Sequence, residues 1–113
     1  MPTRRVEKIN KLLAREAANL FLRELEFPEG IIATVIGVDT SDDLRYADVL
    51  VSVFPPEKTD TAAKLIKKNV YKLQKLVDRR LKMRPVPKLR FRLETAKIDR
   101  LEKIFERIKN ETN

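Results

Sequence analysis

The residues best suited to chemistry in this sequence are two adjacent carboxylates, Asp42 and Asp43, in the segment VDTSDDLRYADVLVSVF (residues 38–54). A pair of carboxylates can act as general acid and base, or can hold a metal ion. The chain has no His and no Cys, which excludes the common zinc sites, the Ser-His-Asp triad and thiol nucleophiles. Its two glycines are too few to build a phosphate-binding glycine loop. An enzyme made from this chain would therefore have to rely on carboxylates alone.

The neighbours of the two aspartates favour a structural role. Asp42 and Asp43 belong to the stretch Thr-Ser-Asp-Asp-Leu-Arg at 40–45, which separates two runs typical of β-strands. Short oxygen-bearing side chains bond to nearby backbone groups and close turns. We therefore interpret the pair as turn formers. We predict no catalytic residue, no metal site and no cofactor.

Length and composition set the class of protein. A chain of 113 residues with 37% charged and 42% hydrophobic residues predicts one globular domain, residues 1–113, with a well-solvated surface. No apolar run approaches the roughly 20 residues that a membrane-spanning helix needs. The absence of cysteine gives no indication of an oxidising compartment. We expect a cytoplasmic protein that does not associate with membranes.

The net charge of +8 is concentrated in one third of the chain. The stretch from Lys64 to Arg92 holds twelve cations and one acid, Asp78, which gives it a net charge of +11. Residues 1–63 carry −3, and residues 93–113 are balanced. A charge excess confined to one contiguous stretch indicates a surface for a polyanion.

Hydrophobic spacing predicts the elements that position this charge. A helix is expected from an N-cap at Thr3 to about Glu24, followed by a well-buried strand over 31–38. Residues 46–54 alternate, with Ala47, Val49 and the following valines on one face. A long helix is expected from a cap at 60 or 61 to about residue 84, where a proline follows. A strand over 88–93 and an amphipathic helix over 98–108 complete the order.

The predicted elements make a small α+β domain, with a three-stranded sheet and helices mainly on one face. On the long helix, lysines and arginines lie opposite the apolar stripe. A solvated helix face normally carries acids one turn away from its lysines, and here Asp78 is the single acid of the stretch. On the last strand, Lys88, Arg90 and Arg92 are expected to face outward.

Three segments resemble a known family. Residues 38–53 are similar to the central segment of ribosome-binding factor A, an acidic Ser-x-Asp turn followed by Leu-Arg-Tyr-Ala and a valine-rich strand. Residues 81–91, LKMRPVPKLRF, resemble the family's Leu-Arg-apolar-Arg, Pro and Leu-x-Phe pattern. Residues 98–104, IDRLEKI, and the pattern around Arg5 and Val6 extend the resemblance over nearly the whole chain. It implies a type II KH-like fold of order α-β-β-α(-α)-β-α, a role in small-subunit ribosome assembly, and no enzymatic activity.

The resemblance also implies a kink between two middle helices, which the family builds with Ala-x-Gly. The equivalent stretch here, residues 67–70, has neither of these residues. Asparagine tolerates the left-handed backbone conformation better than most residues. We therefore expect Asn69 to form the kink.

The combined interpretation is a monomeric, non-catalytic maturation factor that binds small-subunit rRNA on the small ribosomal subunit. Two alternatives remain at this point: a basic module for an acidic protein partner, and a binder of duplex DNA or the nucleoid. RNA dependence of co-sedimentation with ribosomal particles separates the three. The residues expected to contact RNA are Arg45, Lys64, Lys67, Lys68, Lys72, Lys75, Arg79, Arg80, Lys82, Arg84, Lys88, Arg90 and Arg92.

Overall fold

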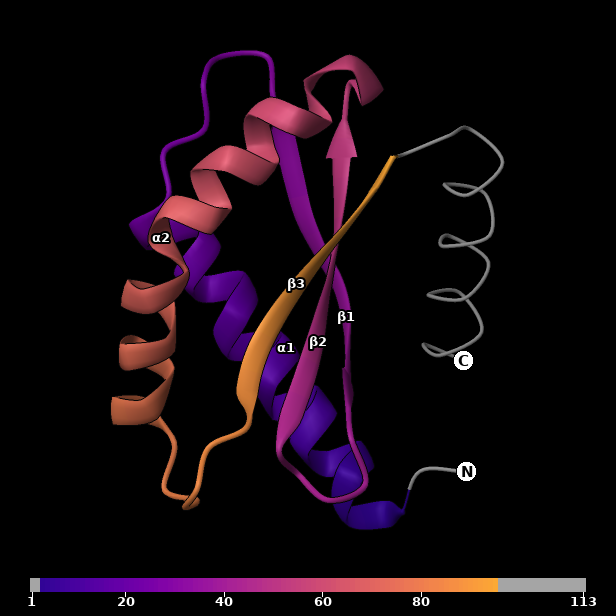
Figure 1. Cartoon of the computed structure of the whole chain (residues 1–113), viewed down its shortest axis with the longest axis vertical. Coiled ribbons are helices and arrows are strands. Elements are labelled where there is room, and N and C mark those ends of the chain that lie inside the picture. Colours follow the sequence, from indigo (N-terminus) through magenta and orange to yellow (C-terminus); the bar gives the residue numbers. More distant parts are fainter. Residues whose placement is uncertain (1–2, 96–113) are drawn as a thin grey trace.

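A computed structural model of the chain describes residues 3–95. In chain order it contains α1 (Arg4–Glu24), β1 (Ile32–Thr40), β2 (Tyr46–Phe54), a short 3-10 turn η1 (Pro56–Lys58), α2 (Thr59–Arg80) and β3 (Lys88–Thr95). Figure 1 shows both helices alongside a twisted sheet. The helix expected over 98–108 lies outside the described residues.

The sheet has the order β1-β2-β3, with β2 in the centre. β1 and β2 are antiparallel neighbours joined by the turn 41–45, whereas β2 and β3 are parallel. Parallel strands cannot be joined by a hairpin, and α2 supplies the long crossover between them. The predicted three-stranded α+β architecture is confirmed.

The first helix begins where the sequence predicts. The Thr3 hydroxyl oxygen accepts a hydrogen bond from the backbone N–H of Val6 at 3.2 Å, which satisfies one of the free amides of the first turn. The apolar residues spaced three and four apart are buried against the sheet: Val6, Ile9, Leu13, Ala17 and Leu20.

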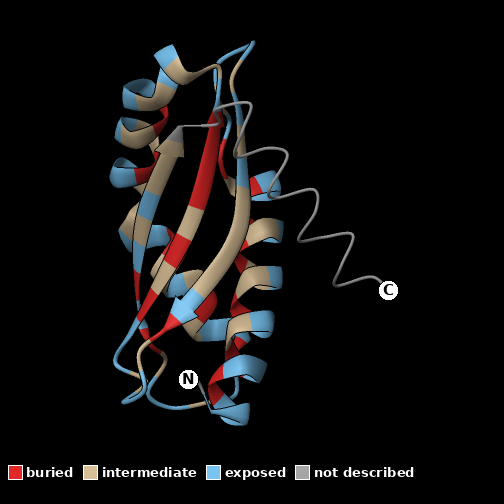
Figure 2. Ribbon diagram, turned by 90° about the vertical axis from the view of Figure 1, so that its right-hand side faces the viewer, coloured by how far each residue is buried: buried red, intermediate tan, exposed pale blue. Residues whose placement is uncertain are grey.

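The core lies between the helices and one face of β2. Ala47, Val49, Val51 and Val53 are completely buried there, as the alternation predicts. Figure 2 shows buried residues concentrated along the central strand and on the inner sides of the helices. The ring of Phe91 on β3 stacks on Phe21 of α1 at 5.8 Å between centroids, which ties the last strand to the first helix.

The first strand differs from the prediction of a well-buried strand over 31–38. It runs from Ile32 to Thr40 and is mostly half-buried, with Ile32 61% exposed. The reason is its place in the sheet. β1 is an edge strand with a neighbouring strand on one side only, so its β-branched residues remain partly exposed to solvent. The pairing register shifts between Val35 and Gly37, a bulge that the composition did not reveal.

The second helix is shorter than predicted at its C-terminal end and begins slightly earlier. It starts at Thr59, so Asp60 lies in its first turn and is not its cap. It ends at Arg80, because Leu81 adopts an extended backbone that buries its side chain. Lys82 and Arg84 therefore lie in the loop before β3 and not on the helix.

The backbone at Asn69 also differs from the prediction. Among the described residues only Leu44 and Gly30 have positive φ, so Asn69 is an ordinary helical residue and the left-handed conformation expected for it is wrong. Its side-chain amide donates to the backbone oxygen of Leu65 at 2.8 Å, four residues back. Side chains that bond in this way bend helices without breaking them. Figure 1 shows α2 changing direction about midway, so its two halves point along different axes.

One side chain joins the second helix to the last strand. The Gln74 side-chain oxygen accepts from the backbone N–H of Leu89 at 2.8 Å, and its NH2 donates to the backbone oxygen of Pro87 at 3.2 Å and to Asp78 at 3.0 Å. The first of these bonds satisfies a backbone N–H on the edge of β3 that faces away from β2. Gln74 thus fixes the position of β3, which carries three of the candidate cations.

Candidate nucleic-acid interface

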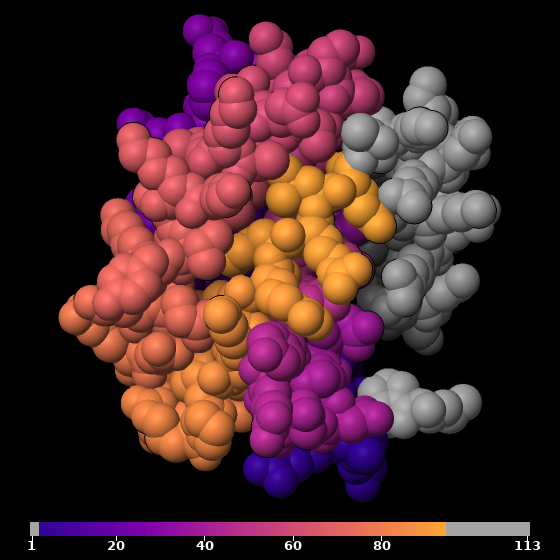
Figure 3. Space-filling model, in the orientation of Figure 1, coloured from indigo at the N-terminus to yellow at the C-terminus, as the bar shows by residue number. Residues whose placement is uncertain are grey.

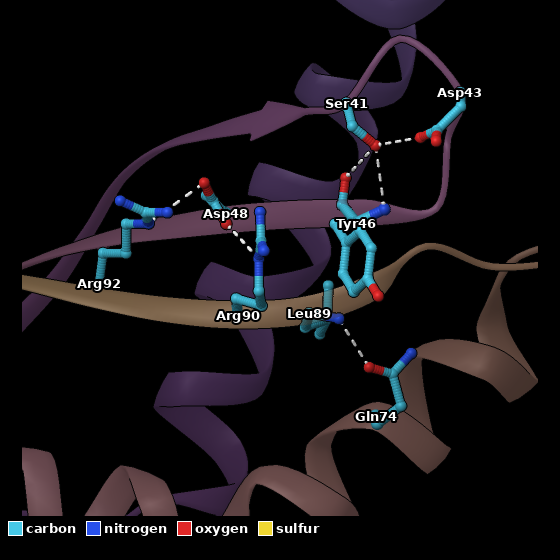
Figure 4. Close-up of polar contacts among 8 residues, drawn as sticks. All are labelled: Ser41, Asp43, Tyr46, Asp48, Gln74, Leu89, Arg90 and Arg92. Atoms are coloured by element: carbon cyan, nitrogen blue, oxygen red, sulfur yellow. Dashed lines mark hydrogen bonds and ion pairs between the residues drawn. The ribbon is translucent and has the colours of Figure 1, made fainter.

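The turn 41–45 contains the two carboxylates that could have formed a reactive site. Asp43 accepts a hydrogen bond from the Ser41 hydroxyl at 2.7 Å (Figure 4). It accepts a second one from the backbone N–H of Arg45 at 3.1 Å. The bond from Ser41, followed by that from the Arg45 backbone, lowers the pKa of Asp43 below its usual value. Within residues 3–95 there is no group of three or more acids that could hold a metal ion. The prediction that the carboxylate closes the turn is confirmed for Asp43, whereas the Asp42 carboxylate lies in the turn without a hydrogen bond to any residue within 3–95.

Arg45 leaves this turn toward solvent. Its side chain is 80% exposed, and its Nε lies 3.8 Å from a carboxylate oxygen of Asp43. An exposed pair at that distance contributes little to stability. The guanidinium is therefore accessible to an anionic ligand.

The outer side of α2 carries the largest group of accessible cations. Lys64, Lys67, Lys68 and Arg79 are exposed, and none of them forms an ion pair with any residue in the described part of the chain. Lys75 is also exposed, with its ammonium 4.6 Å from the ring centroid of Tyr71. We call Lys64, Lys68, Tyr71, Lys75 and Arg79 the outer stripe of α2.

Two cations of α2 point instead toward α1. Lys72 lies 3.1 Å from Glu24, and Arg80 lies 3.2 Å from Glu16. These acids hold the flank of α2 against α1, so Lys72 and Arg80 are less available to a ligand than the outer stripe. The sequence prediction treats all of these cations alike.

The outer face of the sheet contains a second paired group. The carboxylate of Asp48 on β2 forms ion pairs with two arginines of β3, as Figure 4 shows. Its oxygens lie 2.8 Å from the Nε of Arg90 and 3.1 Å from the Nε of Arg92. The parallel register places Asp48 directly beside Arg90. Arg90 also lies over the ring of Tyr46, 4.5 Å from its centroid. The two arginines face outward as predicted, but one shared carboxylate neutralises part of their charge and orients them.

The loop between α2 and β3 and the first residue of β3 supply the remaining candidates. Lys82 and Lys88 are exposed and form no ion pair within residues 3–95. Arg84 donates to the backbone oxygens of Leu81 at 2.8 Å and Met83 at 2.7 Å, so its guanidinium closes the loop after α2. Arg84 is therefore partly structural.

These elements meet on one side of the molecule. Figure 3 shows α2, the loop after it, β3 and the region of the turn 41–45 on a single face. We call this surface the basic face. It joins Arg45, the outer stripe and the exposed cations of the loop and β3, while Lys72 and Arg80 lie at its border with α1.

Sequence reasoning missed the groups that organise the basic face. Asp48, Gln74 and the two glutamates of α1 all act through contacts distant in sequence. Alternation did place Asp48 on the same outward side as the arginines of β3. It gave no register between the strands, and the pairing depends on that register.

The fold and this face define a small KH-like α+β domain with a cationic surface of the kind that binds polyanions. The family model described as ribosome-binding factor A matches residues 5–108. A ribosome-binding factor A of Akkermansia muciniphila is 37% identical over 94 residues, covering 83% of this chain and 74% of the relative. The chain belongs to the ribosome-binding factor A family. Because this is a family of ribosome-binding factors, the prediction that the chain is not an enzyme is confirmed.

Solved structures show the same fold. The crystal structure of ribosome-binding factor A from Thermus thermophilus superposes with a TM-score of 0.67 at 27% identity, covering 78% of this chain and 93% of that one. A homology model of the Thermus thermophilus factor, fitted into a cryo-EM map of its 30S complex, superposes with a TM-score of 0.62 at 29% identity, covering 74% and 88%. The KH-like fold predicted from the sequence is confirmed. Neither helix of the described chain is long and apolar enough to cross a membrane.

Proposed function

We propose that this protein is a maturation factor of the small ribosomal subunit that binds small-subunit rRNA through its basic face. The observation that carries the proposal is the outer stripe, where cations without ion pairs among the described residues gather on one exposed helix surface. Family membership supports the ribosome as the target, and the relative from Thermus thermophilus was fitted into a map of a 30S complex. The protein acts as a single-domain monomer in the cytoplasm.

The mechanism is phosphate neutralisation combined with fit to the shape of the RNA. Each lysine or arginine that meets a phosphate releases condensed counterions, which drives binding without a sequence preference. The bend of α2 and the loop after it shape the face for a folded RNA surface (Figure 1). A protein docked in this way holds an immature rRNA conformation or tests a mature one.

The candidate cations differ in whether they form ion pairs within the described chain. Lys64, Lys68 and Arg79 have no competing acid within residues 3–95, whereas Lys72 and Arg80 are paired with glutamates of α1. A phosphate that took Lys72 or Arg80 would first have to displace a carboxylate. We therefore assign the main phosphate contacts to the outer stripe.

Charge reversal on the outer stripe tests the proposal. Charge reversal by changing Lys68, Lys75 and Arg79 together to Glu should weaken binding to small-subunit rRNA, whatever the RNA sequence. The log–log dependence of affinity on salt, measured between about 50 and 200 mM, should lose about two to three units of slope. An unchanged slope would show that these cations meet only solvent.

A matched control changes the same number of charges on α1. Lys8, Lys11 and Arg15 are exposed there, so their reversal gives the same net charge without touching the basic face. This control should retain the salt slope of the unmodified protein.

Sedimentation with small subunits before and after ribonuclease treatment identifies the partner. Retention on ribosomal proteins after RNA digestion would indicate a protein partner instead.

A further inference from the structure

An exposed aromatic ring lies in the middle of the outer stripe. Tyr71 is 73% exposed, and Lys75 lies over its ring, 4.6 Å from the centroid. Residues three and four positions apart are neighbours on a helix surface, so Lys67 and Lys68 flank the ring on its other side. The ring is thus surrounded by ammonium groups along the helix axis.

The hydrophobic core does not account for Tyr71. The ring contacts among core aromatics join Phe21 to Phe27 and to Phe91, all on the sheet side of the molecule. Tyr71 instead lies on the opposite side of α2 from Ile66 and Leu73, which are buried. Burial therefore does not explain the large ring at this position, and most of its surface is open to a ligand.

The acids near Tyr71 do not pair with the lysines beside its ring, because Lys67, Lys68 and Lys75 form no ion pair within residues 3–95. Asp78, the single acid between Lys64 and Arg92, has its carboxylate bonded to the Gln74 amide at 3.0 Å. The charge around the ring is therefore complementary to RNA. An aromatic face bordered by cations is the arrangement that binds unpaired nucleotides, because the base stacks and the flanking phosphates meet the cations.

We propose that Tyr71 is a stacking site for an unpaired nucleotide of the bound rRNA. The inference rests on the proposed function and adds the class of RNA at this point of the basic face: single-stranded and not duplex. In an A-form duplex the bases stack on one another, so their faces are closed to a side chain. Lys67, Lys68 and Lys75 then hold the phosphates on either side of the stacked base.

The test compares two RNA probes of equal length, one unstructured single strand and one duplex. Tyr71→Leu removes the ring and keeps a good helix former, so the fold is retained. It should weaken binding to the single strand about fivefold or more, and binding to the duplex less than about twofold. Tyr71→Phe keeps the ring and should bind both probes like the unmodified protein.

Two further measurements separate stacking from other roles of the ring. A 2-aminopurine placed in the single strand should change its fluorescence on binding, and Tyr71→Leu should abolish that change. Lys75→Gln removes a charge and keeps the ring, so it should weaken binding to the single strand and to the duplex to a similar degree. If Tyr71 merely positioned Lys75, the Leu and Gln variants would behave alike, which would overturn the inference.

Failure of the inference is distinguishable from failure of the proposed function. If the unmodified protein does not bind small subunits or their rRNA at all, the proposed function is wrong. If it binds them but prefers duplex RNA, or if Tyr71→Leu binds both probes unchanged, the stacking site is wrong and the basic face remains.

Discussion

Replacing Gln74 should release the last strand from the second helix. In Gln74→Ala three hydrogen bonds are lost: from the backbone N–H of Leu89 and to Pro87 and Asp78, at 2.8 to 3.2 Å. Each such bond contributes about 0.5–1.5 kcal/mol net. Because the site is half-buried and water replaces part of the bonding, we expect a loss of about 2 kcal/mol of unfolding free energy.

The expected loss can be measured as a change in melting temperature. Unfolding entropy of about 2.1 cal/mol/K per residue converts about 2 kcal/mol into a decrease of roughly 8 °C for a chain of 113 residues. At neutral pH, melting followed by circular dichroism gives the melting temperature, and unfolding in urea gives the free energy of unfolding independently. Asn19→Ala, an exposed change on α1, is the control and should shift stability by less than about 0.5 kcal/mol.

A second variant tests the geometry of the contact. Gln74→Glu keeps an oxygen for Leu89 but loses both donated bonds and places a carboxylate beside Asp78. The like charge raises the pKa of the new carboxyl, so the variant should regain stability as the pH falls through its titration. If Gln74→Ala lowers stability by less than about 0.5 kcal/mol, or if Gln74→Glu is as stable as the unmodified protein at neutral pH, α2 does not hold β3 through this side chain.

Three other predictions concern the backbone, the core and the turn. The Asn69→Ala variant should be about 1 kcal/mol more stable than Asn69→Gly in thermal unfolding, because the residue is helical. The opposite order of stability would indicate a left-handed conformation at this position. Val51→Ala and Phe91→Ala should cost about 2 and about 3 kcal/mol in chemical denaturation, and shifts below about 0.5 kcal/mol for both would mean that the inner face of the sheet is misassigned. Asp43→Ala should be less stable than Asp42→Ala at neutral pH, because hydrogen bonds from the serine hydroxyl and a backbone amide of the turn lower the pKa of Asp43. That difference should be complete above the ordinary carboxyl pKa of 3.8 and disappear as the pH falls toward the lowered value; a gap that persists in acid would exclude the carboxylate as its source.

The elements that follow a simple period could be predicted from the sequence. The second strand, Tyr46–Phe54, has the bounds that its alternation indicates, and α1 begins after its threonine cap. In both cases local preference and burial agree. The burial of the first strand could not be predicted, because composition alone does not distinguish a central strand from an edge strand.

The detailed geometry of α2 and of the basic face could not be predicted. Local propensity could not show that Asn69 stays helical by bonding to the Leu65 oxygen, nor that Leu81 leaves the helix to reach the core. The total charge of the face follows from the sequence. Which cations are accessible depends on glutamates of α1 and on Asp48, partners that are brought near only by the tertiary fold.

The parallel pairing of β2 with β3 has a consequence for how the protein is made. The register joins Tyr46 to Lys88 and Val53 to Thr95, so the sheet is completed only after the whole intervening helix has been synthesised. Such non-local pairings raise the contact order and slow folding, whereas α1, β1 and β2 can associate from nearby sequence. A chain still leaving the ribosome would have the acidic first half in place before its cationic surface. We expect the newly made protein to acquire affinity for polyanions late, in the same step that closes the sheet.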